Sequence, residues 1–162
     1  MVGKIIPLLS GGGGATALLE PDITRDLLAQ AKARAHSAAN RASAASGRAV
    51  NREKVTEHVG SAHGSARAVT TANTARDAAW HAYVTANHAL KVSCYAVAAA
   101  EAVTRVQFAA ARALEAAKAA AFAPDDVAVA DLAAAAEEAA AAASNSAYGA
   151  PHVVSIPRIG CD

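Results

Sequence analysis

The chain has 162 residues, of which 54% are hydrophobic and 18% are charged, and its net charge is +1. This composition excludes a solvated, disordered tail, and the charge gives no global field that draws the chain to nucleic acid or to an acidic membrane. About a third of the residues are Ala, and aromatic residues make up only 4%. Because each Ala buries little area, worth roughly 25 cal/mol per Å², stability must come from helix propensity and close backbone contacts, or from burial against a partner.

Residues 1–21 are predicted to form an irregular N-terminal arm. The glycine run at 11–14 costs too much backbone entropy for a helix. Pro7 interrupts the apolar stretch before that run, so we expect neither an export signal nor a membrane span. A helix then starts after Pro21, with Asp22 as its N-cap.

The first helical segment carries apolar residues at alternating steps of three and four, which is the pattern of a helix seam. These seam residues are Leu28, Ala31, Ala35, Ala38, Ala42, Ala45 and Ala49. Because nearly all are Ala, two helix backbones can approach closely here. Gly47 and the stretch at 50–51 are predicted to end or bend this helix. A second pattern, weakened by Gly60 and Gly64, then runs to Val69.

A helix boundary is predicted at residues 70–74, where Thr74 precedes Asp77 in a form of capping box. The pattern that follows consists of Ala75, Ala79, Ala82, Ala86 and Ala89. Large side chains gather on a neighbouring face of the same segment, namely Trp80, Tyr83, Leu90 and Cys94. We therefore expect this segment at the centre of the bundle.

Two further seams complete the helical region. The first consists of Val103, Val106, Ala110, Ala113, Ala117 and Ala120. It either continues the preceding helix or begins a new one after a bend near Glu101. Pro124 ends it, and Asp125 and Asp126 suit the positive N-terminal end of the last helix. The seam of that helix consists of Val129, Leu132, Ala136, Ala139 and Ala143.

Residues 149–162 are predicted to form a second irregular arm, apolar and broken by Pro157 like the first arm at Pro7. The two arms are expected to pair as a small ribbon or to pack under the bundle; the alternative is that they reach a neighbouring subunit. The predicted fold class is therefore all-α: an Ala-rich antiparallel bundle of four to five helices over residues 22–148, with irregular N- and C-terminal arms.

Charges are distributed unevenly along the chain. From Lys32 to Lys54 there are six bases against one acid, Glu53, whereas the segment from Asp125 to Glu138 is acidic and free of bases. We interpret these regions as solvated faces, or as segments that attract each other within the bundle. The alternative, an anion-binding stripe, lacks the aromatic or Gly-rich residues that usually accompany such a site.

No metal site, cofactor site or catalytic residue is predicted. The local His pairs are five or seven residues apart, whereas two imidazoles on one helix bind one zinc ion at a spacing of four. Ser and Thr residues lie in helical patterns without a strand–turn–helix elbow. Cys94 and Cys161 are too few and too far apart for a disulfide framework, so we expect a reduced, cytoplasmic chain. Because none of these residue patterns is catalytic, we also expect that the chain is not an enzyme.

A partner-binding surface is the favoured functional interpretation, because Trp, Tyr and Arg are enriched at interface hot spots. The candidate residues are Arg67, Trp80, His81, Tyr83 and His88. The structural alternative is that the polar members of this set bond a neighbouring helix. The partner is expected to be another protein or copies of this chain, with a homo-oligomer as one outcome and no nucleic acid.

The middle of the chain carries a recognisable pattern. It reads Ala62-His63-x-x-Ala66-Arg67, Ala78-Ala79-x-His81-Ala82-x-x-Thr85-Ala86, His88-Ala89-Leu90 and Tyr95-Ala96. This pattern resembles a family of bacterial helical immunity proteins, which neutralise toxins by binding them. Asn87 stands where that family has a second His, and Trp80 replaces a small residue. The resemblance implies a cytoplasmic, non-catalytic protein that sequesters a partner.

Two other functions stay open at this point. One is a self-assembling structural subunit whose terminal arms link neighbouring copies. The other uses the flat Ala and Thr faces at ice, or an apolar face at a lipid or granule surface. The irregular spacing of Thr counts against ice.

Overall fold

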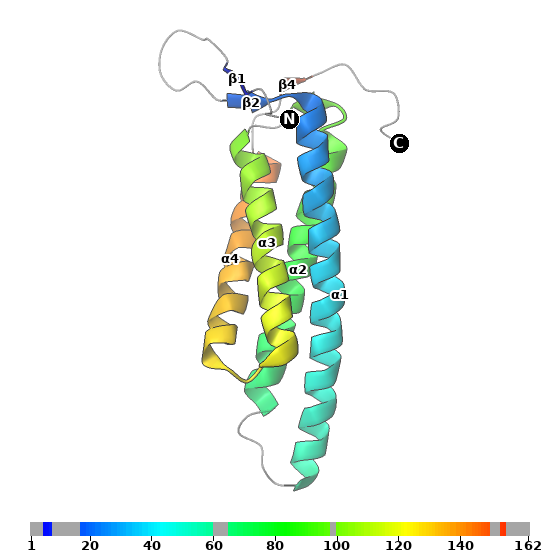
Figure 1. Cartoon of the computed structure of the whole chain (residues 1–162), viewed down its shortest axis with the longest axis vertical. Coiled ribbons are helices and arrows are strands. Elements are labelled where there is room, and N and C mark those ends of the chain that lie inside the picture. The colour runs from blue at the N-terminus through cyan, green and yellow to red at the C-terminus, as the bar shows by residue number, and fades with distance from the viewer. Residues whose placement is uncertain (1–4, 8–16, 60–64, 98–99, 150–152, 155–162) are drawn as a thin grey trace.

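The computed structural model describes residues 5–7, 17–59, 65–97, 100–149 and 153–154. These residues form four long helices: α1 (Pro21–Val59), α2 (Ser65–Val92), α3 (Ala100–Phe122) and α4 (Val127–Gly149). Figure 1 shows consecutive helices running in opposite directions along the long axis, with the short strands at the end where α1 begins. The predicted all-α class is confirmed, and the described helices number four.

The four helices occupy the corners of a bundle. Both α1 and α4 pack against α2 and α3, and α2 also contacts α3. Helices α2 and α3 therefore form one diagonal of the bundle, and α1 and α4 lie at the two other, opposite corners. Helices α1 and α4 are the outermost in Figure 1. As a result, α1 and α4 present the two outer edges of the bundle.

Alanine fills most of the described core. Every predicted seam residue of α1 and α3 is buried, and so is the pattern that begins at Ala75 in α2. The largest fully buried apolar side chains are Leu28, Val103 and Val106. Because α1 and α3 begin at the same end of the bundle, these larger side chains lie near that end. Small side chains elsewhere keep the helices close, so stability depends on many short-range dispersion contacts.

The helix boundary predicted at residues 70–74 is wrong, and the first helix does not end near Gly47. Gly47 and residues 50–51 lie inside α1, which continues to Val59, and residues 70–74 lie inside α2. Gly47 is exposed, and an added Cβ would meet no atom within 4 Å. This glycine therefore lowers the stability of α1 only through its weak helix propensity, by about 1 kcal/mol relative to Ala. Buried Ala45 and Ala49 flank it, and their packing outweighs that cost.

The connection between α3 and α4 confirms the break predicted at Pro124. The Oδ1 atom of Asp126 accepts a hydrogen bond from the backbone N–H of Ala128 at 2.9 Å. The backbone carbonyl of Asp126 also accepts from the N–H of Ala130 at 3.1 Å. Asp126 therefore caps α4, and its carboxylate lies at the positive end of the helix dipole.

The described strands of the arms pair within the chain. Strand β1 (Ile5–Pro7) pairs antiparallel with β2 (Ala17–Leu19), and β3 (Ala96–Val97) pairs antiparallel with β4 (Val153–Val154). The expected ribbon between the two arms is therefore wrong for these strands, which form two separate sheets. Strand β2 also contacts α3, so the N-terminal arm packs on the end of the bundle.

Cys94 is buried and disulfide-bonded, so the expectation of a reduced thiol is wrong for this residue. The other cysteine of the chain, Cys161, lies outside the described residues. The pairing of β4 with β3 brings the C-terminal segment beside Ala96, two residues after Cys94.

Two buried hydroxyl groups lack a hydrogen-bond partner within the described part of the chain. They are the Oγ1 atoms of Thr24 and Thr85, and each residue is 1% exposed. In contrast, the Ser46 hydroxyl on α1 donates to Oδ1 of Asn73 on α2 at 2.6 Å. A buried polar group without a partner costs about 1–3 kcal/mol.

We expect Thr85→Val to raise the free energy of unfolding by about 1 kcal/mol. Valine has the shape of threonine and a similar helix propensity, so the substitution removes the unpaired hydroxyl and leaves the packing and the helix propensity nearly unchanged. Urea denaturation followed by circular dichroism measures the effect. The control is Thr104→Val, because the exposed Thr104 hydroxyl donates to the Ala100 carbonyl at 2.9 Å. An unchanged or lower stability for Thr85→Val would contradict the prediction.

Candidate protein-binding surface

Three aromatic rings from two helices form one surface, which we call the aromatic surface: His36, Trp80 and Tyr83. Trp80 and Tyr83 lie one turn apart on α2, with ring centroids 5.5 Å apart and an interplanar angle of 36°. The Tyr83 ring also contacts the imidazole of His36 on α1, at 5.4 Å and 45°. Tyr83 therefore links the exposed Trp80 to the neighbouring helix.

The alanine seam of α2 explains why this surface faces outward. Ala79, Ala82 and Ala86 are at most 1% exposed and occupy the interior side of the helix. Trp80 follows Ala79 on a different face and is 58% exposed. The expected central position of this segment holds for the helix, since α2 contacts α1, α3 and α4. Its Trp80 ring nevertheless lies outside the core, and Tyr83 is half-buried.

A shallow, open groove of about 440 Å³ lies between α1 and α2 beside the rings. Its lining consists of Ala29, Lys32, Ala33, His36, Tyr83 and Leu90. The alanines and Leu90 provide an apolar floor, while Lys32 contributes a positive charge. Such a groove suits the apolar ridge of another helix and has little depth for enclosing a small molecule.

The remaining predicted site residues lie elsewhere. His88 stacks on Tyr148 of α4, with centroids 4.0 Å apart and an angle of 19°, so it joins α2 to α4. His81 is half-buried on α2. Arg67 is exposed, but it precedes Trp80 by thirteen residues, about 20 Å along the helix at 1.5 Å per residue. The structure therefore brings together Trp80 and Tyr83 from the predicted set.

His36 is the functional candidate that the sequence analysis missed. It lies on α1, far from Tyr83 in sequence, and no local spacing marks it. Its contact with Tyr83 depends on the register between α1 and α2, which the alanine seams leave unspecified because their residues are alike. Lys32 and His36, one turn apart on the exposed side of the α1 seam, were the only available signal.

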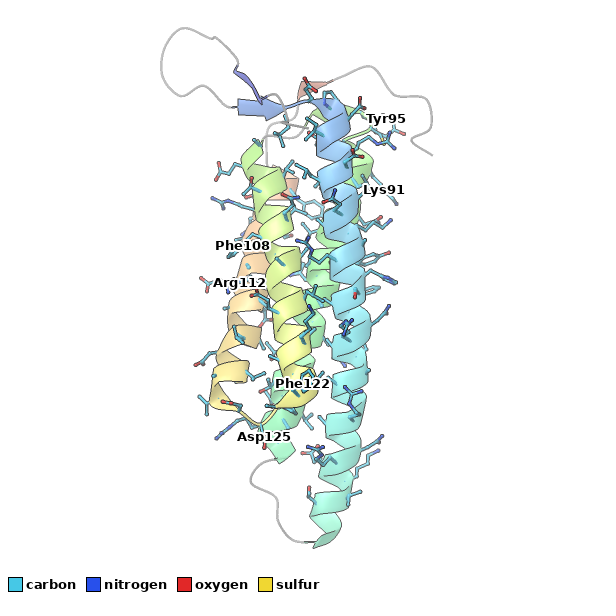
Figure 2. The ribbon with its side chains drawn as sticks, viewed as in Figure 1. Lys91, Tyr95, Phe108, Arg112, Phe122 and Asp125 are labelled. Carbon is cyan, nitrogen blue, oxygen red and sulfur yellow. The ribbon has the colours of Figure 1, made fainter. Side chains whose placement is uncertain are left out.

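Other exposed aromatic residues lie away from this surface. Figure 2 shows Phe108 and Arg112 on α3, where the guanidinium lies 5.0 Å from the centre of the Phe108 ring. Phe122 is 93% exposed at the far end of α3, near Asp125 in Figure 2. The crevice beside Phe122 measures about 40 Å³, enough for a few water molecules.

Within the described residues, no group of three or more His, Cys, Asp or Glu side chains is placed to hold a metal ion. In the same part of the chain, no helix combines the length and the apolar character needed to cross a membrane. No family model, no curated protein and no solved structure matches the chain.

Proposed function

We propose that this chain is a non-catalytic protein-binding bundle that sequesters a partner, as an immunity-type protein does. The observation that carries the proposal is the aromatic surface beside the α1–α2 groove. A Trp that is 58% exposed and held against a Tyr is costly to leave in water, and such pairs anchor protein interfaces. The resemblance around His81 and Arg67 supports the same class.

The shape of the groove favours a helix of the partner. The groove runs between α1 and α2, and its small Ala29 and Ala33 side chains leave room for the apolar residues of an amphipathic helix, spaced three and four apart. Trp80 then packs along one side of that helix. Lys32, at the α1 side of the groove, favours an acidic residue on the partner, which adds orientation more than affinity.

We expect Trp80→Ala to weaken partner binding by at least about 30-fold, equal to about 2 kcal/mol at a hot-spot residue. The wild-type protein and the variant are immobilised and exposed to the same bacterial lysate. Proteins retained only by the wild type are then purified, and their dissociation constants are measured by calorimetry. The fold is not at risk, because the indole is exposed and Ala favours the helix.

Phe108→Ala is the matched control, since Phe108 is 52% exposed on α3, outside the aromatic surface. We expect this variant to retain the same partner with unchanged affinity. The proposal fails if every retained protein binds wild type and Trp80→Ala equally. It also fails if Phe108→Ala weakens binding as strongly, because the effect would then reflect general exposed aromatic area.

The alternative of a structural subunit linked by its arms stays a prediction. Each described arm strand pairs within its own chain, and most of both arms lies outside the described residues. A cytoplasmic location also stays a proposal, separate from partner binding. The disulfide bond of Cys94 argues against a cytoplasmic location, because disulfides persist mainly in oxidising compartments.

A further inference from the structure

The outer edge at α1 is basic. Over residues 27–52 it contains five bases and no acid: Lys32, Arg34, Arg41, Arg48 and Arg52. Arg34, Arg41 and Arg48 are seven residues apart, so they form one stripe along the helix, and all three are exposed. We call these three residues the basic stripe.

The opposite edge, at α4, is acidic. Residues 119–149 contain five acids and no Lys or Arg, and all five acids are exposed. Asp131 and Glu138 lie on α4 and are also seven residues apart. We call this pair the acidic stripe. Its spacing, about 10.5 Å at 1.5 Å per residue, equals the spacing between neighbouring arginines of the basic stripe.

Neither stripe is neutralised within the described fold. The ion pairs found among the described residues join Arg76 to Asp77, Arg105 to Glu101 and Arg112 to Glu115. All three lie within α2 or α3, and none includes a residue of either stripe. Because α1 and α4 lie at opposite corners, the two stripes do not face each other within one chain. The expected attraction between these segments inside the bundle is therefore not found in the described part of the chain.

We propose that a second copy of this chain covers each stripe, with the basic stripe of one copy against the acidic stripe of the next. The crevice at the end of α3 places Pro124 level with Arg48 and Ala49 of α1, so α4 starts near that height. Because both stripes repeat every seven residues, about 10.5 Å, each carboxylate of one copy can lie within half a repeat of an arginine of the next copy. A neighbouring copy placed with its α4 against α1, and with its bundle axis in the same direction, brings the two stripes together with the facing helices antiparallel.

The side chains between the charges allow this approach. Ala44 and Gly47 are exposed between Arg41 and Arg48 on α1. Ala134 and Ala135 are exposed between Asp131 and Glu138 on α4. Small residues on both facing helices leave the long Arg side chains free to reach the carboxylates while the helix backbones come close. The two edges are thus complementary in spacing, charge and shape.

The contact joins different surfaces of the two copies, so each copy binds two others, and the copies build a ring or an open row. Exposed ion pairs are individually weak, and salt screens them. We therefore expect association that rises with protein concentration. It should be strong at about 0.01 M salt, where the Debye length is about 30 Å, and absent at about 1 M, where it is about 3 Å. This inference concerns other faces than the aromatic surface.

Complementary charge reversal tests the pairing. Arg41→Glu with Arg48→Glu reverses two charges of the basic stripe, and Asp131→Lys with Glu138→Lys reverses both charges of the acidic stripe. Sedimentation velocity at low salt should show oligomers for the wild type and monomers for each double variant. An equal mixture of the two double variants should associate again, because the reversed positions of one variant then face residues of opposite charge on the other. Circular dichroism checks that each variant stays helical.

The control is Lys91→Glu with Lys118→Glu, which changes the net charge as much as the α1 variant does but at exposed positions of α2 and α3. It should associate like the wild type. A wild type that stays monomeric at low salt overturns the proposal, and so does a mixture that fails to associate. If the wild type instead binds heparin through Arg41 and Arg48 while remaining monomeric, the basic stripe is a binding site for a polyanion, and the proposal is also overturned.

Discussion

Replacing Ala42 by Leu is expected to lower the free energy of unfolding by about 3 kcal/mol, the upper end of the usual cost of overpacking. Ala42 lies in the middle of the α1 seam and is 0% exposed. Leucine adds an isopropyl group where α1 approaches two neighbouring helices, and side chains of Ala offer no alternative rotamer that makes room. The helices must therefore separate along much of their length, which weakens the dispersion contacts on which this core depends.

Urea denaturation followed by far-UV circular dichroism measures this loss. Ala44→Leu is the matched control, since Ala44 lies two residues away on the exposed side of α1. Leu has nearly the helix propensity of Ala, so the control should stay within about 0.5 kcal/mol of the wild type. Equal stabilities for the two variants would mean that the seam is not closely packed and would contradict this account of the core.

The seams were predictable because their pattern is local. Alternating steps of three and four fix which side of a helix is apolar, whatever the helix packs against. The sequence therefore identified the buried face of α1 through Leu28, Ala35 and Ala42, and that of α3 through Val103 and Val106. Which seams meet was not predictable, since alanine seams are nearly interchangeable and carry little information on register.

The helix ends were harder because boundary signals are weak where packing continues. Thr74 resembles an N-cap, yet Thr71, Ala72 and Ala75 around it are buried, and α2 passes through the whole stretch. An isolated capping residue contributes about 1 kcal/mol. Several buried contacts in succession outweigh it. Pro124 was a reliable boundary for the opposite reason, because proline removes a backbone donor and clashes with the preceding turn.

The candidate surface was half predictable. Trp80 and Tyr83 stood out by residue type, but the expected central position of their segment did not indicate on which face of the helix their side chains lie. Helices held close by Ala79 and Ala82 have no interior space for an indole, so Trp80 must lie outside. The pairing of Tyr83 with His36 and the opposite placement of the charged edges are properties of the assembled bundle. They follow only from knowing which helices are neighbours.

Leu28→Ala is expected to lower the free energy of unfolding by about 3–4 kcal/mol, within the usual range for a buried leucine. Leu28 is 0% exposed and is among the few large side chains of a core that is otherwise mostly Ala. The alanines of this core cannot extend to fill the cavity, because an alanine side chain has no rotamer to change. Thermal and urea denaturation measure the loss. Leu27→Ala is the control: Leu27 is only partly buried against the same core, and its loss should be about 1 kcal/mol. Equal losses for both variants would contradict the view that the end of the bundle where α1 begins depends on Leu28.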